Sequence, residues 1–260
     1  EVEERTPVED RPAGLNSLAV RRWLEARLRS ASALRIAPSE TAVAGTYRLS
    51  VALGLRGEGE GGATGPRVVL VAARAVAVGE REGAPLEANR VHPVPPGAAR
   101  RSAAELAAVR RAVELIADEL AFQAELAVAP ESRLALALDS SDPDRVVAAE
   151  AIVAARRAKA AVPALIRLLH HANSRVADRA IGALVAVGDR RGVKPLTRLA
   201  ELKDTARLAK VLDAIGALGG EEAKDFLEFV STGHEDEDIR NLAAEALQRL
   251  RRREAAPPAP

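Results

Sequence analysis

The sequence predicts two domains of different class: a small α+β domain over residues 15–129 and an all-α domain of repeated helix pairs over residues 130–253. Two observations carry this prediction. Residues 46–56, TYRLSVALGLR, alternate between apolar and other side chains, which is the pattern of a half-buried strand. Residues 180–184 and 214–218 both read AIGAL, within a region that has helical periodicity only. Residues 1–14 are charged and non-periodic and are expected to be a flexible tether, and residues 254–260 a disordered tail.

The α+β domain is expected to begin with a helix over residues 15–31, in which apolar residues recur at helical spacing. A short strand, ALRIAP, is expected to end at Pro38. In residues 46–56 one face of the strand would carry Tyr47, Leu49, Val51, Leu53 and Leu55. The glycine-rich residues 57–66 then indicate a flexible connection.

The next segment, RVVLVAARAVAVG (residues 67–79), is apolar on both faces and is typical of a central strand. A short last strand is expected near Leu86–Val91. The long helix Ser102–Ala127 follows, and Ser102 with Glu105 has the spacing of a capping box, which satisfies free amides at a helix start. A helix, about three or four strands and a long helix predict a sheet covered by helices on one face.

Beyond Pro130 the predicted helices are short and recur regularly. Asp142, Asn173 and Asp204 are equally spaced, each precedes an apolar helical stretch, and each is a favourable N-cap residue. A further equal step reaches Glu235. The two AIGAL copies begin at residues 180 and 214, a slightly longer interval, so the exact repeat register stays open at this point. A helix pair of this size cannot bury its apolar face alone, and stacked copies provide a common core.

The segment AVPALIRLLHHANSRVADRAIGALVAVGDRRGVKPLTRL resembles the HEAT repeat, in particular the short HEAT-like repeats of the phycobilisome lyase type. The shared features are the small-residue helix, the GD turn and VPALIRLL opening the next helix, and the likeness covers residues 131–253. It implies an α-solenoid that binds proteins. The first half is similar in pattern to small domains of bacterial envelope lipoproteins. That similarity implies a role in assembly at a periplasmic or outer-membrane location, and a cytoplasmic location is the alternative.

The composition excludes several classes of protein. Lys and Arg number 38 against 37 acids, and aromatic residues make up 2%, which argues against nucleic-acid binding. There is no Cys, so disulfides and thiolate chemistry are excluded, and no apolar run has the length of a transmembrane segment. The chain begins at Glu1 and has no Met, which either a processed precursor or a trimmed chain would explain. Our preferred explanation is a tether behind a removed signal or behind a lipidated residue outside this sequence.

A search for chemistry yields no catalytic residue, metal site or cofactor site. HEAT-like hydroxylases bind iron through several His-Glu pairs, whereas here only His234–Glu235 fits that pair. Residues 57–65 lack the order of a phosphate-binding loop, and Ser140 and Ser141 have no nucleophile motif around them. We therefore expect a protein that is not an enzyme, and a metal-dependent HEAT-like enzyme remains an alternative.

Charge placement suggests where a protein partner would bind. Two basic clusters are expected on one edge of the stack, formed by Arg156, Arg157, Lys159, Arg190, Arg191 and Lys194. Partner contacts are also expected on the inner helices, at Arg167, His170, Arg198 and Glu201. We therefore expect a protein-binding scaffold or adaptor. Ordinary solvated turns are the alternative reading of these charges. A structural subunit of a larger envelope assembly, pairing through an exposed strand, is the alternative function.

Overall fold

The computed structural model describes residues 2–4, 11–29, 47–57, 67–77, 85–199 and 205–255. The chain divides into two compact units, Glu1–Val128 and Ala129–Pro260. The first is an α+β unit and the second is helical throughout its described residues, as the sequence predicted. Within the described residues, no helix combines the length and the apolar character that crossing a bilayer requires.

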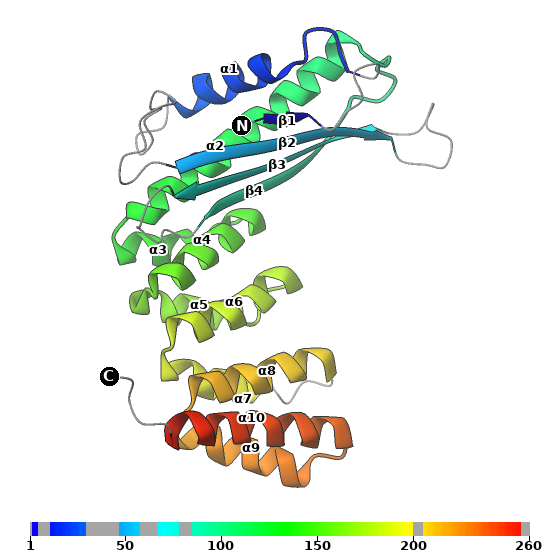
Figure 1. Ribbon diagram of the computed structural model, residues 1–260. Helices are drawn as coiled ribbons and strands as arrows, with labels where there is room; N and C mark the ends of the chain where they lie inside the picture. The colour runs from blue at the N-terminus through cyan, green and yellow to red at the C-terminus, as the bar shows by residue number, and fades with distance from the viewer. Residues whose placement is uncertain are drawn as a thin grey trace. The chain divides into compact units, whose positions relative to one another are not determined.

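The first unit contains a four-stranded sheet in the order β1-β2-β3-β4 (Figure 1). Its strands are β1 (Val2–Glu4), β2 (Tyr47–Gly57), β3 (Arg67–Ala77) and β4 (Leu86–Pro93). Strands β2, β3 and β4 pair antiparallel, so that β3 is central, as expected. The expected strand ending at Pro38 lies outside the described residues.

Residues 2–4 are not part of a tether, and that prediction was wrong for them. They form β1, which pairs in parallel with Val51–Leu53 of β2. The physical reason is that β2 is otherwise an edge strand whose backbone groups are left without partners. A charged segment with no periodicity of its own can still supply backbone hydrogen bonds, which depend little on its side chains.

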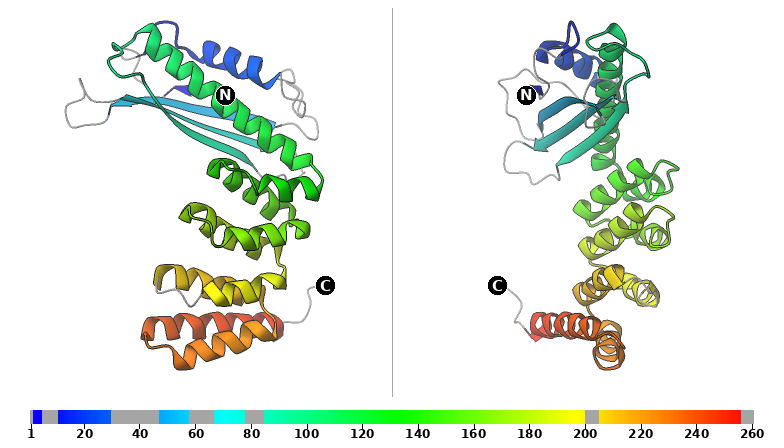
Figure 2. Two further views of the ribbon diagram at one scale, coloured as in Figure 1. Left: turned by 180° about the vertical axis from the view of Figure 1, so that it is seen from behind. Right: turned by 90° about the vertical axis from the view of Figure 1, so that its right-hand side faces the viewer.

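Helices α1 (Ser17–Leu28) and α2 (Ala103–Val128) complete the first unit, and α2 runs along one face of the sheet (Figure 2). The core between them contains Val51, Leu53, Val71 and Ile116, all buried. The opposite positions of the strands, such as Arg48 and Ser50, are exposed. The alternation of residues 46–56 therefore correctly predicted which face of β2 is buried.

The predicted Ser102 cap at the start of α2 is present, whereas Glu105 accepts from the amide of Arg101 rather than from that of Ser102. The Glu105 amide donates to Ser102 Oγ over 3.2 Å, and Glu105 Oε2 accepts from the Arg101 amide over 2.6 Å. The other carboxylate oxygen accepts from Arg67 at the start of β3, and Arg67 also donates to the Ala98 carbonyl. Glu105 is buried, so this one side chain joins the helix start to the sheet.

The second unit consists of helix pairs. We call the first helix of each pair the A-helix and the second the B-helix. The A-helices are α3 (Glu131–Ala137), α5 (Val162–Leu168), α7 (Val193–Leu199) and α9 (Glu221–Gly233). The B-helices are α4 (Pro143–Arg156), α6 (Ser174–Val187), α8 (Thr205–Leu218) and α10 (Glu237–Ala255), and each B-helix packs on the next one (Figure 1). Short 3-10 turns, Lys159–Ala161 and Arg190–Gly192, precede α5 and α7.

The A-helices recur at the interval between the predicted N-cap residues, which is shorter than the interval between the two AIGAL copies. Each A-helix has a completely buried leucine at the equivalent place, and these four leucines are equally spaced: Leu134, Leu165, Leu196 and Leu227. Asp142 and Asn173 cap α4 and α6 as expected, accepting from Asp144 and Arg175 amides over 2.9 and 3.0 Å. Asp204 lies outside the described residues, and the cap of α10 is Asp236 rather than Glu235.

The longer interval between the AIGAL copies is therefore not the structural repeat. The copy at residues 180–184 lies within α6, whereas the copy at residues 214–218 ends α8. The shift matters at Gly216, where an added Cβ would lie 3.2 Å from the Cβ of Ala246 on α10. This glycine permits close packing of α8 on α10, and Gly182 of the other copy has nothing within 4 Å.

Candidate partner-binding surface

The turns that follow α4 and α6 carry the basic edge expected from the sequence. Arg157 ends α4 with φ +50°, in the left-handed conformation, and Gly188 occupies the equivalent place after α6 with φ +72°. Lys159 and Arg190 begin the two 3-10 turns at equivalent positions, and both side chains are exposed. The edge does not continue into the next turn, where Glu221 and Glu222 open α9.

Two cations of this edge, Arg156 and Arg191, are exposed but also form bonds within the protein. Arg191 binds both carboxylate oxygens of Asp189, over 3.0 and 2.8 Å, and donates to the Lys159 carbonyl of the preceding turn over 3.0 Å. The Arg191 guanidinium thereby lowers the pKa of Asp189. Arg156 donates to the Ala129 carbonyl. The sequence alone could not show that Arg156 and Arg191 bond within the protein, because neighbouring arginines and lysines have the same local sequence context.

Among the residues expected on the A-helices, one cation is paired and others have no partner among the described residues. Arg167 forms an ion pair with Asp139 over 2.8 Å. Arg198 and Lys194 on α7 are exposed, and neither forms an ion pair or side-chain hydrogen bond within the described part of the chain. His170 is exposed in the turn that follows α5. Glu201 lies outside the described residues.

The histidines preceding two B-helices act as turn caps. His171 Nδ1 accepts from the Asn173 amide over 3.0 Å, and His234 Nδ1 accepts from the Asp236 amide over 3.1 Å. Ser140 occupies the equivalent place before α4 and accepts from the Asp142 amide over 3.2 Å. In the described ranges, no three His, Asp or Glu side chains gather as metal ligands would.

Ion pairs connect each B-helix to the next. Arg175 of α6 pairs with Asp144 of α4 over 3.0 Å, and Lys210 of α8 pairs with Asp178 of α6 over 2.5 Å. Arg249 of α10 pairs with Asp213 of α8. In each case the acid lies on the earlier helix. These six side chains are therefore satisfied within the protein.

Glu150 of α4 is the polar group that sequence reasoning missed. It is 1% exposed, and neither carboxylate oxygen has a hydrogen-bond partner among the described residues. Burial raises the pKa of Glu150 to about 8, against a smaller opposite effect of Arg179. The equivalent positions of α6 and α8 hold Ile181 and Leu212, both buried. Glu150 thus occupies a core position, and no local pattern marks it, because the surrounding VVAAEAIVAA is compatible with an exposed glutamate.

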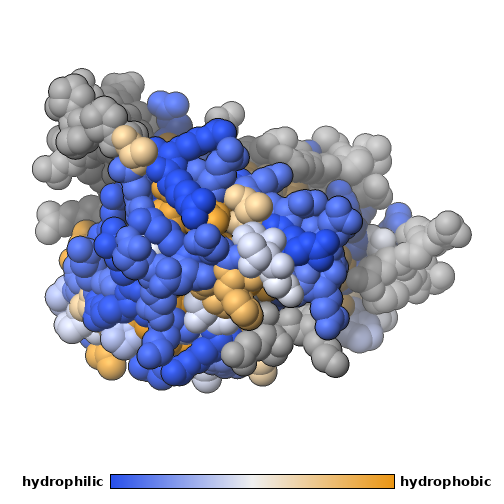
Figure 3. All heavy atoms as spheres, turned by 90° about the horizontal axis from the view of Figure 1, so that it is seen from below, coloured by the Kyte–Doolittle hydropathy of each residue, from blue (hydrophilic) through white to orange (hydrophobic). Residues whose placement is uncertain are grey.

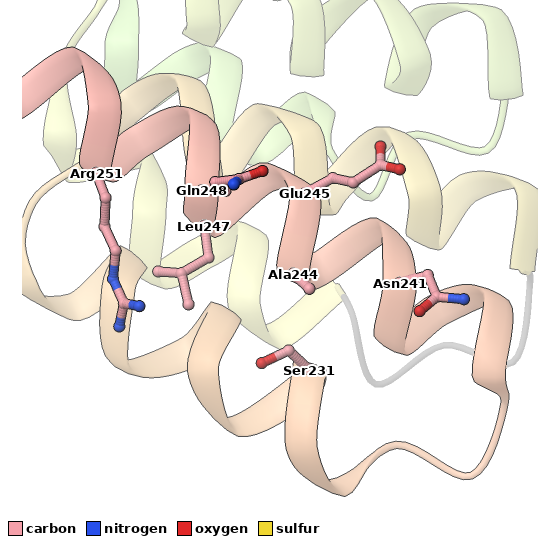
Figure 4. A pocket seen from close by; sticks show the side chains of 7 residues that line it. All are labelled: Ser231, Asn241, Ala244, Glu245, Leu247, Gln248 and Arg251. Carbon is pink, nitrogen blue, oxygen red and sulfur yellow. The ribbon is translucent and has the colours of Figure 1, made fainter.

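The end of the second unit at α9 and α10 is mainly hydrophilic (Figure 3). An open pocket there is lined by Ser231 of α9 and by six residues of α10: Asn241, Ala244, Glu245, Leu247, Gln248 and Arg251 (Figure 4). Arg251 pairs with Glu228 over 3.3 Å. Counted from the N-cap of its own helix, Ala244 is equivalent to Ile181, which is buried in α6. Ala244 is thus exposed among polar residues where Ile181 is buried.

The β4 edge of the first unit, a candidate for strand pairing, is partly closed. The Gln123 side chain of α2 accepts from the Glu87 amide over 3.0 Å and donates to the Glu87 carbonyl over 2.8 Å. These are the two backbone groups that another strand would use at this position.

Comparison with known proteins gives no family assignment. No family model matches the chain, and no curated protein is significantly similar to it.

Proposed function

We propose that the second unit is a HEAT-like solenoid and that the protein is a non-catalytic scaffold that binds a protein partner through the A-helices and their turns. The observation that carries the proposal is a group of exposed cations on the A-helices and their turns that have no ion-pair partner among the described residues. On the B-helices, Arg175, Lys210 and Arg249 each pair with an acid of the preceding B-helix. Arg157, Lys194 and Arg198 on the turn and A-helix side are exposed and have no such partner in the described part of the chain.

The regular helix pairs support the solenoid interpretation. Buried leucines recur at one interval, each B-helix packs on the next, and the last pair has a polar outer surface. Stacked repeats present extended surfaces, which suit the recognition of proteins. For the location we propose the bacterial envelope, on the basis of the sequence pattern of the first unit; cell fractionation with an antibody against the protein tests this.

The alternative of a structural subunit that assembles through a sheet edge has less support. Strand β1 covers the β2 edge at Val51–Leu53, and Gln123 occupies the Glu87 position of the β4 edge.

A triple charge reversal tests the scaffold function. We expect Arg157→Glu, Lys194→Glu and Arg198→Glu together to abolish capture of the partner from native extracts, and the thermal midpoint to stay unchanged. A matched triple reversal on the first unit, at Arg22, Arg48 and Arg56, changes the net charge equally and should retain capture. All three control residues are exposed. Equal capture by both variants would refute binding through the A-helix side. Arg156 and Arg191 are left unchanged because their side chains bond within the protein.

A further inference from the structure

A row of four exposed positions crosses the A-helices at the repeat interval: Leu136, Arg167, Arg198 and Phe229. Each lies two residues after one of the completely buried leucines. Two residues correspond to a rotation of about 200° around an α-helix, so each of the four side chains points away from the core. We call this set the A-row.

The two ends of the A-row are large apolar side chains that are exposed to solvent. Leu136 is 69% exposed and Phe229 is 72% exposed, and they are the two large hydrophobic side chains that are exposed in the described part of the second unit. They occupy the same position of the repeat, on α3 and α9. Isolated exposed apolar residues are common, but two at equivalent positions on either side of a pair of arginines form a pattern.

The middle of the A-row is positively charged. Arg198 is exposed and unpaired within the described residues, and Lys194 lies one turn before it on α7. Arg167 pairs with Asp139, and both side chains are more than half exposed, so water screens the pair and a partner's carboxylate can compete for the guanidinium. Arginine binds carboxylates in a bidentate manner, which makes these two positions suited to Asp and Glu side chains.

Resting on the proposed scaffold function, we propose that the A-row binds an acidic protein segment that has an apolar residue toward each end. The acidic middle pairs with Arg167 and Arg198, and the apolar ends contact Leu136 and Phe229. Packed helices lie about 8–10 Å apart, so the two ends of the row are about 24–30 Å apart. A segment of about 20 helical residues, or about 9 extended ones, spans this distance.

Charge complementarity favours this occupant over the others that a solenoid can bind. Two or three cations are too few for strong attraction to a nucleic acid or a lipid surface, whose affinity rises with the number of neutralised phosphates. The pocket at α9 and α10 is a weaker candidate, because the one large apolar residue that lines it, Leu247, is itself buried and offers less apolar contact than Phe229.

A peptide library selected on the full-length chain tests the proposal. The library displays random peptides of about 20 residues, enough for either backbone conformation. We expect the enriched peptides to carry Asp or Glu in the middle and an aliphatic or aromatic residue toward each end. Synthetic copies should bind with an affinity that falls as salt is added.

Variants then locate the bound peptide. Arg198→Glu and Phe229→Ser should each weaken binding by about tenfold or more, as expected for an arginine or aromatic anchor. Arg22→Glu and Leu18→Ser, both on α1 of the first unit, are the matched controls and should change binding by less than about twofold. Both control residues are exposed, and circular dichroism checks that all four variants keep their helix content.

The other outcomes separate this proposal from the function on which it rests. Peptides that bind Arg198→Glu and Phe229→Ser unchanged but lose affinity for Arg157→Glu would overturn the A-row while leaving the scaffold function in place. A selection that enriches no peptide would overturn both. Binding of phosphatidylserine vesicles or duplex DNA that depends on Arg198, without peptide binding, would overturn the protein partner in favour of a lipid or a nucleic acid.

Discussion

Replacing Glu150 by Gln removes a carboxyl group that the folded protein has to keep uncharged. Glutamine has nearly the same shape and does not ionise, so the substitution isolates the effect of the charge. Glu150 is buried on α4, where the later B-helices have Ile181 and Leu212. We therefore expect Glu150→Gln to raise the free energy of unfolding at neutral and alkaline pH, with little effect at about pH 4.5.

The direction follows from the two states of the carboxyl group. Burial raises its pKa from 4.5 to about 8 in the folded protein. Between these values the folded state holds a proton that the unfolded state has released, so folding becomes less favourable as the pH rises. One pKa unit corresponds to about 1.4 kcal/mol, which makes the cost about 3 kcal/mol at pH 7 and about 5 kcal/mol above pH 8. These values are upper limits, because local opening of the packing around α4 would hydrate the carboxylate.

Urea unfolding followed by circular dichroism at several pH values measures the effect. Wild type should lose stability between about pH 5 and pH 8 relative to Glu150→Gln, and the two curves should approach each other near pH 4.5. Trp23, the single tryptophan, lies in the first unit and supplies a separate fluorescence signal that the substitution should not shift. Parallel stability curves for the two proteins across this pH range would refute the buried, neutral carboxyl group.

Three further substitutions test other parts of the structure. Glu105→Ala removes the buried carboxylate that accepts from both Arg67 and the Arg101 amide, so we expect a loss of about 3 kcal/mol, seen in the urea unfolding of Trp23 fluorescence. Arg157→Gly relieves the left-handed conformation at φ +50° and should stabilise the second unit by about 0.5–1 kcal/mol, read from its thermal midpoint. Gln123→Ala frees the Glu87 backbone groups of β4 and should cause concentration-dependent self-association in sedimentation velocity, with a loss of about 1–2 kcal/mol; a monomer at all concentrations would contradict a closing role for Gln123.

Sequence reasoning succeeded where side-chain periodicity decides burial. The alternation in β2 gave the buried face, and the capping box at Ser102 and Glu105 gave the start of α2. The N-cap residues gave the repeat interval, because a cap lies at a fixed place in each repeat. The interval between the two AIGAL copies is not the structural repeat, because segments of small residues can pack at several places along a helix.

Other features depend on contacts between segments distant in the chain. The bond from Arg191 to the Lys159 carbonyl joins successive turns. Composition cannot distinguish Arg191 from Lys194, whose side chain has no partner among the described residues. Strand β1 forms because β2 offers an edge, which no pattern within residues 2–4 reveals. The burial of Glu150 depends on the helix that packs against it. Leu136 and Phe229 can be recognised as equivalent only after the register is known.

The links between B-helices have a mechanical consequence. Each pair, such as Asp144 with Arg175 or Asp213 with Arg249, joins only adjacent helices. A pulling force applied at Ala255 would therefore load α10 first, and α8 only after α10 has detached. Bonds arranged in series break one after another. We therefore expect several small force peaks in the force–extension curve when the second unit is stretched between two handles.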